Sequence, residues 1–310
     1  MARLALVATI LTVATGCDKA KASLPFGRAE GLDLESRPDI LFQVFGDVNG
    51  PRMLPIAAIR DGQLQRIVLT QKGWTEFDAI YLRRGKSYTL YRGGRADGGV
   101  EVTQGMWERP DNPLYTLQGC KLHTPLAAVR VASAYRPSAF TVEYLASTAR
   151  VGHTRVVDAL PGGELTRIAR ELAVQAGVTA RQLDSLTLRA TSFASGAGAG
   201  PTIVAAFVDP AESSGRADTP VASLFLIANR DSTGSYAATY THRARGAISS
   251  ADLRRYIDHL DVTGDGIDEV FLEGWTYGGD TFFSVLTWRD GMWTEMYKSG
   301  ASWCLDDSKK

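Results

Sequence analysis

Short apolar runs separated by glycine-containing turns constrain the fold of this chain more than any other feature. The first three runs are Ile40–Phe45, Leu54–Ile59 and Leu64–Leu69, and the pairs Asn49-Gly50 and Asp61-Gly62 separate them. Asn-Gly and Asp-Gly between apolar runs are strong signals of β-hairpins, because both residues tolerate positive φ. The sequence therefore predicts short antiparallel strands in this region.

Similar runs continue to about residue 150. Strands are predicted at Tyr88–Tyr91 and Val100–Thr103, which flank a glycine-rich turn, and at Leu126–Ala132 and Phe140–Leu145. The segment Arg109–Pro125 is rich in proline and irregular. Short alternating runs bury their apolar faces most readily in a small barrel or sandwich. We therefore expect residues 40–150 to form an N-terminal β domain.

One segment has the spacing of a helix instead of a strand. Its apolar residues recur at three- and four-residue intervals: Leu165, Ile168, Ala169, Leu172 and Ala173. Gly177 stands where a helix would end, and Thr179 with Gln182 forms a capping box for a second short helix ending near Leu186. Such a stripe usually faces a core, although a partner-binding helix is an alternative. We expect residues 151–190 to be a helical connection.

The C-terminal part, residues 191–305, is predicted to be a second β domain. A glycine-rich stretch, Ser195–Gly200, precedes the strand-like Thr202–Val208, which favours a flexible surface loop over a phosphate-binding loop. Three later strands, Glu269–Thr276, Thr281–Trp288 and Met292–Lys298, are predicted to form an antiparallel meander. The expected fold class is α+β, mostly β.

Composition excludes one class of partner. The chain has 34 Lys and Arg against 34 Asp and Glu, and its hydrophobic fraction of 45% is ordinary for a packed domain. Without a surplus of positive charge no broad basic face for nucleic acid is expected.

The N-terminus has the pattern of a secretory signal. Leu4–Val13 is apolar but about half as long as the roughly 20 residues that span a bilayer, so it fits the core of a cleavable signal. The following Ala14-Thr15-Gly16-Cys17 resembles the lipobox of bacterial lipoproteins, although the family usually has Leu where this chain has Ala14.

That resemblance implies a location. Residues 1–16 would be the signal peptide, Cys17 would become acylated, and residues 17–39 would tether a body to the membrane of a bacterial cell envelope, facing the periplasm or the surface. Two acyl chains anchor a protein stably, whereas one is marginal. The alternative is ordinary cleavage after Ala20-Lys21-Ala22, which would discard Cys17 and yield a secreted protein.

Two further cysteines fit an oxidising compartment. Cys120 and Cys304 remain under either cleavage, and we expect them to form a disulfide bond. The alternative is two independent buried thiols.

The sequence Asp261–Glu269 has the oxygen spacing of a calcium loop. Side-chain oxygens stand at positions one, three, five and nine, namely Asp261, Thr263, Asp265 and Glu269, and the carbonyl of Ile267 would be position seven. Ca²⁺ takes six to eight oxygen ligands, which a tight glycine-containing turn supplies by folding alternate residues inward. The alternative is a structural turn whose acids accept hydrogen bonds from backbone N–H groups.

The loop is not an EF-hand, because position twelve is Leu272 instead of a glutamate. It resembles the FG-GAP or VCBS-type calcium loop over about forty residues, Tyr256–Tyr297, and departs from that family at Thr263 and Glu269. The resemblance implies bound Ca²⁺ and a C-terminal sheet like one blade of a propeller. No series of repeats accompanies it, so a full propeller is not expected.

Aromatic residues are frequent near the C-terminus. Trp293 and Tyr297 alternate onto one face of the last predicted strand. We expect them to lie in a core, the usual outcome, although an exposed row could stack on sugar rings.

No catalytic motif stands out. The histidines His123, His153, His242 and His259 lack metal-binding spacing, and no Gly-x-Ser-x-Gly motif is present. The predicted function is therefore a binding or interaction module with an unknown protein or glycan partner. The alternatives are an envelope hydrolase acting on polysaccharide or peptide, for which Glu273 and Asp280 are a conceivable pair, and a structural component of an envelope complex.

Overall fold

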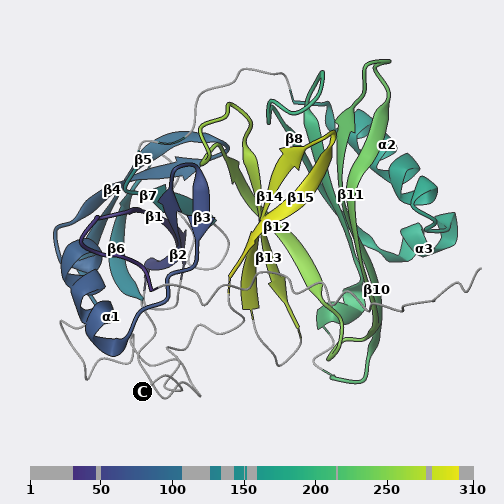
Figure 1. The fold of residues 1–310 in the computed structure, drawn as a ribbon. Coiled ribbons are helices and arrows are strands. Elements are labelled where there is room, and N and C mark those ends of the chain that lie inside the picture. The colour runs from purple at the N-terminus through teal and green to yellow at the C-terminus, as the bar shows by residue number, and fades with distance from the viewer. Residues whose placement is uncertain are drawn as a thin grey trace, which may run out of the picture. The chain divides into compact units, whose positions relative to one another are not determined.

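The computed structural model describes residues 31–46, 50–106, 126–133, 143–149, 151, 159–213, 216–276 and 281–299, all within one compact unit, Gly31–Lys310. The described residues form three antiparallel sheets and a few short helices (Figure 1). The predicted class, α+β and mostly β, is confirmed. Within the described residues, no helix is both long and apolar enough to cross a membrane.

The first sheet closes on itself, and we call it the barrel sheet. Its strands follow the order β1-β7-β4-β5-β6-β2-β3, and β1 also pairs with β2, which completes a ring to which β3 is appended. Of the two predicted forms, a small barrel or a sandwich, this sheet therefore has the barrel form. The strands are β1 (Asp39–Phe45), β2 (Arg52–Arg60), β3 (Gln63–Gln65), β4 (Ser87–Arg92), β5 (Arg95–Gln104), β6 (Ala127–Ala132) and β7 (Glu143–Ser147).

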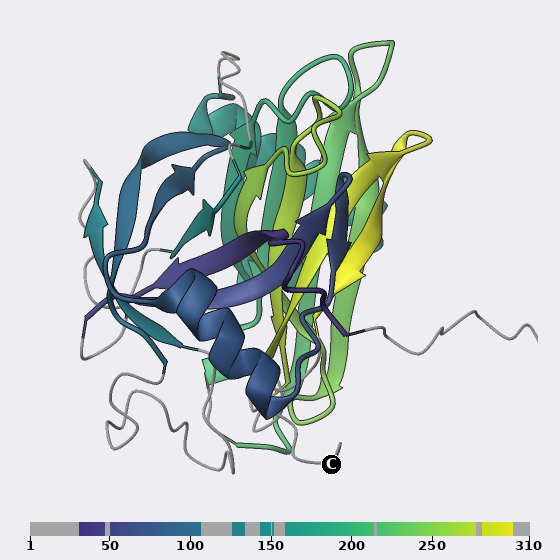
Figure 2. The same cartoon turned by 60° about the vertical axis from the view of Figure 1, so that its left-hand side comes forward.

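Two helical segments pack against the barrel interior. They are the α-helix α1 (Gln71–Phe77) and the π-helix η1 (Asp78–Leu82), which Figure 2 brings to the front. Trp74, Phe77 and Tyr81 from these segments join Phe42 and other inward residues of the strands in one buried cluster. Each of these large aromatic side chains removes about 150–250 Å² of surface from water, so the helical segments contribute much of the barrel core.

The prediction of a strand over Leu64–Leu69 is wrong beyond Gln65. The strand stops there, and Thr70 caps α1 by accepting a hydrogen bond of 3.2 Å from Gly73 N. Ile67 and Leu69 still pack on the barrel core, so their alternation reflects burial without sheet pairing.

The second sheet, called the outer sheet, contains β8 (Thr187–Phe193), β9 (Thr202–Val208), β10 (Pro220–Arg230) and β11 (Tyr236–Ala247) in the order β11-β10-β9-β8. The short 3-10 helix η3 (Pro210–Ser213) lies between β9 and β10. β8 begins inside the range expected to be helical.

Helices α2 (Gly162–Gln175) and α3 (Ala180–Ser185) pack on one face of the outer sheet. The predicted apolar stripe of α2 is buried against residues such as Phe207 and Leu226, so it is a core-facing stripe. The capping box of α3 is present, with Gln182 N donating to Thr179 Oγ1 at 3.3 Å and Thr179 N donating to Gln182 Oε1 at 2.9 Å.

The third sheet, called the central sheet, is formed by the last four strands of the chain. It is the meander β12 (Leu253–Leu260), β13 (Glu269–Trp275), β14 (Thr281–Arg289) and β15 (Met292–Lys298). The three predicted C-terminal strands are thus confirmed, and β12 is added to them. The four strands make one blade-like sheet, and a propeller is not shown.

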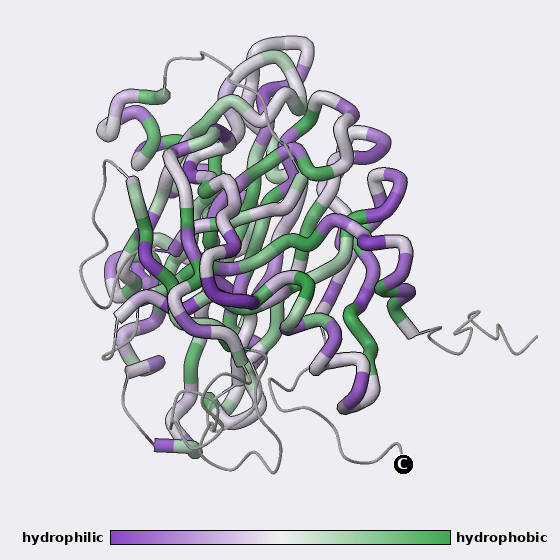
Figure 3. The backbone as a smooth tube through the Cα atoms, turned by 90° about the vertical axis from the view of Figure 1, so that its left-hand side faces the viewer, coloured by the Kyte–Doolittle hydropathy of each residue, from purple (hydrophilic) through white to green (hydrophobic). Residues whose placement is uncertain are grey.

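The central sheet is covered on both faces. Phe271 and Phe283 pack with Leu41 of the barrel sheet, whereas Val270 and Leu286 pack with residues of the outer sheet such as Val204 and Phe225. Strands covered on both faces usually have a nearly continuous run of apolar residues in their sequence, and the central part of β13 has such a run. Figure 3 shows the hydrophobic residues along the strands and the hydrophilic ones mainly at the turns. Trp293 and Tyr297 are both buried, as expected of core residues, but the prediction that they share one face is wrong. Trp293 packs toward the outer sheet and Tyr297 toward the barrel sheet, because the β14–β15 register is irregular between Val285 and Leu286.

Candidate functional site: the Asp261–Glu269 loop and the polar clusters of the central sheet

The loop Asp261–Glu269 joins β12 to β13. Gly264 and Gly266 both have positive φ, which lets the backbone turn tightly around the side chain of Asp261. Asp261 Oδ1 accepts a hydrogen bond of 2.7 Å from Gly264 N, and Oδ2 accepts one of 3.0 Å from Gly266 N. Asp265, on the exposed tip, accepts a hydrogen bond of 2.8 Å from Ile267 N. Both aspartates therefore organise the backbone of the loop.

Glu269, like Asp268, is almost fully enclosed, with 1% of its surface exposed. Its Oε2 accepts hydrogen bonds from Val262 N at 3.0 Å and Thr263 N at 3.3 Å, and its Oε1 accepts from the hydroxyls of Thr263 at 3.1 Å and Thr287 at 3.2 Å. Burial raises the pKa of Glu269 to about 7, because the hydrogen bonds only partly offset the loss of water and Asp265 and Asp261 add repulsion.

These contacts bear on calcium in two ways. A carboxylate has about four lone-pair sites, and all four on Glu269 accept hydrogen bonds, as the structural-turn alternative requires. The exposed Asp265 uses one carboxylate oxygen for Ile267 N, and Thr263 and Ile267 contribute neighbouring oxygens, so part of the donor set fits the ion. Among the described residues no group of three or more His, Cys, Asp or Glu side chains has an arrangement suited to a metal. Calcium at this loop stays a prediction.

A second polar cluster lies beside the loop, where all three sheets meet. His259 Nδ1 lies 2.8 Å from Asp268 Oδ2, both side chains are buried, and the imidazole stacks on Phe193 of the outer sheet at a centroid distance of 3.7 Å. Asp268 N donates to Ser195 O at 2.7 Å. Ser195 is fully buried, so the loop predicted to be flexible and superficial is anchored at this end.

The barrel sheet contributes its β4–β5 turn to this cluster. Gly93 N donates to both carboxylate oxygens of Asp258, at 3.0 and 3.2 Å. At Gly94 an added Cβ would lie 2.7 Å from Asp268 Oδ2 and 2.8 Å from His259 Cε1. The turn therefore touches the central sheet so closely that only glycine fits at position 94. His259 lies in β12, and no pattern in the sequence indicates this junction.

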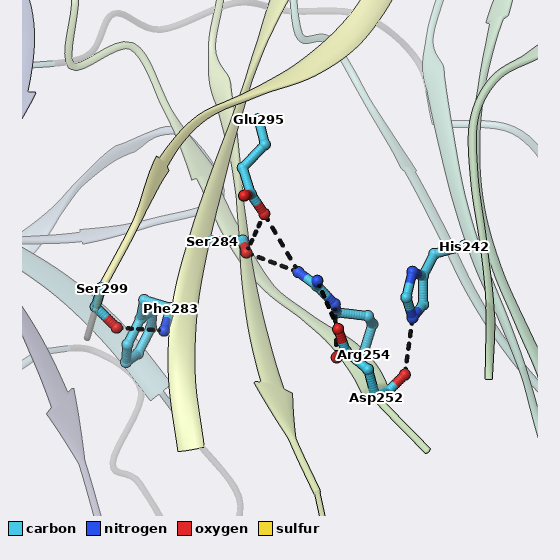
Figure 4. Close-up of polar contacts among 7 residues, drawn as sticks. All are labelled: His242, Asp252, Arg254, Phe283, Ser284, Glu295 and Ser299. Carbon is cyan, nitrogen blue, oxygen red and sulfur yellow. Dashed lines mark hydrogen bonds and ion pairs between the residues drawn. The ribbon is translucent and has the colours of Figure 1, made fainter. Parts of the chain in front are cut away.

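A third cluster surrounds Arg254 of β12, whose side chain is 6% exposed (Figure 4). Its guanidinium donates to both oxygens of Asp252 at 3.0 and 2.9 Å and to Ser284 Oγ at 2.7 Å. Ser284 in turn donates to Glu295 at 2.7 Å. His242 Nε2 lies 2.7 Å from the carbonyl oxygen of Asp252. Every charged group here has a partner of opposite sign, so the cluster is a cross-strand brace.

Arg255, the next residue, points toward the barrel sheet. It pairs with Glu273 on β13 and, at 2.5 Å, with Glu143 on β7. Burial raises the pKa of Glu143, although Arg255 acts against this. Glu273, suggested as half of a carboxylate pair, is thus held in an ion pair, and Asp280 lies outside the described residues.

Several predicted site residues also lie outside the described part of the chain. They are Cys17, Cys120 and Cys304, together with the signal segment, His123 and His153. The lipidation and disulfide assignments stay predictions.

Comparison of the chain with known protein families, with curated proteins and with solved structures found no match.

Proposed function

We propose that this chain is a membrane-anchored lipoprotein of a bacterial cell envelope and that its β body is a binding or interaction module. The observation that carries the proposal is the apolar run Leu4–Val13 followed by Ala14-Thr15-Gly16-Cys17. Acyl chains on Cys17 would fix the protein to the membrane. Residues 17–39 would reach roughly 25 Å as a flexible coil, enough to hold the body clear of the lipid headgroups.

The contacts of the described acids support binding over hydrolysis. Sugar hydrolysis requires one carboxyl to donate a proton and another to act as base or nucleophile across a cleft. Glu143 and Glu273 instead share Arg255, and Asp252 and Glu295 lie against Arg254. Carboxylates held this way stabilise the fold through charge-assisted hydrogen bonds and are poorly placed to exchange protons with a substrate.

Calcium belongs to the proposal as a stabiliser of the loop. Asp261, Thr263, Asp265 and the carbonyl of Ile267 would hold the ion, whereas Glu269, the fifth predicted ligand, would keep its lone pairs on its four hydrogen-bond donors. The ion would supply positive charge beside acids that are otherwise costly to bury. Because the loop leads directly into β13 in the middle of the body, ordering it would stabilise the central sheet.

Mass spectrometry of the mature N-terminus, from a bacterial host that processes lipoproteins, tests the anchor. We expect a chain that begins at Cys17 and carries at least a diacylglyceryl group, with Cys17→Ser yielding no lipidated product. An unmodified chain that begins at Ser23 would contradict the anchor and favour secretion.

Incubation of the full chain with isolated envelope polysaccharide and envelope proteins separates binding from hydrolysis. We expect the protein to sediment with one of these materials without releasing reducing ends or new amino termini. Release of either product would contradict the binding role and favour the hydrolase.

A further inference from the structure

A small hollow lies on the helix side of the outer sheet, where α2 connects to α3. Its lining includes Val178, Gln182, Ser223, Leu224, Arg243 and Arg245. Val178 and Leu224 are buried and form an apolar floor, while Arg243 and Arg245 are exposed at the rim. The hollow therefore combines an apolar base with positive charge.

The strand geometry puts the two arginines side by side. Arg243 is paired with Leu224 and Arg245 with Ala222 in the β10–β11 register. Residues two apart on a strand project from the same face, about 7 Å from each other along the strand. Leu224 packs in the cluster beneath the helices, so both arginines project toward the helix side. Long side chains at this separation can converge on one bound group.

The positive charge at this hollow is not balanced within the described residues. No carboxylate among them lies within 4.0 Å of Arg243 or Arg245, whereas Arg254 and Arg255 each contact two. A Cβ added at Gly177 would lie 3.3 Å from Arg243 Nη2, so this guanidinium lies near the C-terminal end of α2. The C-terminal end of a helix carries about half a negative charge. More than one of the two positive charges of Arg243 and Arg245 therefore stays unbalanced.

One of the two remaining polar side chains of the lining, Gln182, also presents a donor. Gln182 Oε1 accepts hydrogen bonds of 2.9 Å from both the backbone N and the hydroxyl of Thr179, which leaves its amide N–H₂ to donate. Ser223 Oγ accepts a hydrogen bond of 2.9 Å from Asp209 N and donates one to Glu212, so its proton is not available to a ligand. A ligand in this hollow would meet two guanidinium groups and an amide donor.

We propose that this hollow binds an anionic group, a carboxylate or a phosphate, through Arg243 and Arg245. Guanidinium groups match both anions in bidentate geometry. The inference rests on the binding role proposed above and gives it a ligand class, an acidic ligand whose anionic group lies at the rim of the hollow between the two arginines. Because the site lies on the folded body, it does not depend on Cys17.

Isothermal titration calorimetry of the full chain with inorganic phosphate, and separately with succinate, tests the proposal. We expect saturable one-to-one binding of at least one anion, weakened at least tenfold by Arg243→Gln and by Arg245→Gln. Arg243→Lys should retain part of the affinity because it keeps the charge but loses the bidentate geometry. The phosphate and succinate arms show which anion the site prefers.

Matched controls keep the result specific. Arg181→Gln on α3 and Arg289→Gln at the β14–β15 turn remove exposed arginines outside the hollow and should leave the affinity unchanged. The melting temperatures of all variants should match the parent, since the side chains are exposed. Absence of saturable heat with both anions, or equal losses in the control variants, would overturn the proposal. Such a failure would leave the N-terminal mass and the sedimentation result standing, so the two proposals fail separately.

Discussion

The indole Nε1 of Trp293 donates a hydrogen bond of 2.8 Å to Oδ1 of Asn229, and this bond crosses from β15 of the central sheet to β10 of the outer sheet. Both residues are 3% exposed. Asn229 Oδ1 also accepts 2.8 Å from Thr239, and its Nδ2 donates to Thr202 Oγ1 at 2.8 Å and to Ala197 O at 3.0 Å. One amide side chain therefore satisfies four buried polar groups at the interface of two sheets.

Truncation of this amide should be costly. Asn229→Ala leaves the indole N–H and the Thr239 hydroxyl without their acceptor, and unsatisfied buried groups cost about 1–3 kcal/mol each. We expect a loss of about 3–5 kcal/mol for Asn229→Ala and about 2 kcal/mol for Trp293→Phe, measured by urea unfolding. Met292→Ala, next to Trp293 but 49% exposed, should change the free energy of unfolding by less than about 0.5 kcal/mol. Equal effects of Asn229→Ala and Met292→Ala would contradict this account.

Gly93 and Gly94 form a matched pair for testing the junction of the barrel and central sheets. Both have positive φ, at +59° and +74°, so alanine at either position is strained by about 1 kcal/mol. A Cβ meets nothing within 4 Å at Gly93, but at Gly94 it would lie under 3 Å from Asp268 and His259. Gly94→Ala should therefore destabilise the protein by about 1–3 kcal/mol more than Gly93→Ala in urea unfolding. Equal losses would show that the turn does not press on the junction.

The hairpins and helices with local signals could be predicted from the sequence. Asp61-Gly62 and Asp290-Gly291 have positive φ at both positions, as Asp-Gly turns favour. The α2 stripe is buried at every predicted position because a helix that covers a sheet needs one apolar face.

Features that depend on distant contacts could not be predicted. Helix α1 has only seven residues and contains Gly73, so propensity argues against it, and it is stabilised by packing of Trp74 and Phe77 in the barrel. No local pattern indicates that the last four strands form the central sheet. The candidate sites also depend on contacts between residues far apart in the sequence. Glu269 accepts a hydrogen bond from Thr287, and the hollow beside Arg243 is lined in part by the α2–α3 connection.

Asp258 should make stability depend on pH. Burial raises the pKa of Asp258 to about 6, against about 3.9 in an unfolded chain. The native state therefore binds its proton more tightly, and this contribution to stability is complete below about pH 4 and lost as the pH rises through 6. The difference is at most about 3 kcal/mol between pH 4 and pH 7.

Urea unfolding at several pH values between 4.5 and 7.5 measures this. Asp258→Asn should flatten the decline of unfolding free energy with pH relative to the parent protein, because the amide does not titrate. Asp218→Asn, an exposed aspartate with 81% of its side chain accessible, should leave the slope unchanged. Parallel slopes for the parent and Asp258→Asn would show that Asp258 does not titrate in this range.

Calcium should stabilise the fold through the Asp261–Glu269 loop. A ligand present at about 100 times its Kd stabilises a native state by about 2.7 kcal/mol, so thermal melting in calcium and in chelator should differ by several degrees. Asp265→Ala should abolish the difference, because Asp265 has an exposed carboxylate with a free oxygen at the loop tip.

Asp231→Ala is the control, since Asp231 Oδ1 caps another turn by accepting hydrogen bonds from Thr233 N at 2.8 Å and Ser235 N at 3.0 Å. It should lower stability equally in calcium and in chelator. The contrary outcome is a parent that melts identically in both, with Asp265→Ala losing only a turn contact as Asp231→Ala does. That outcome would show that the acids of the loop act only through hydrogen bonds within the fold. Glu269 would then act only through the hydrogen bonds that occupy its lone pairs, and calcium would no longer be part of the proposed function.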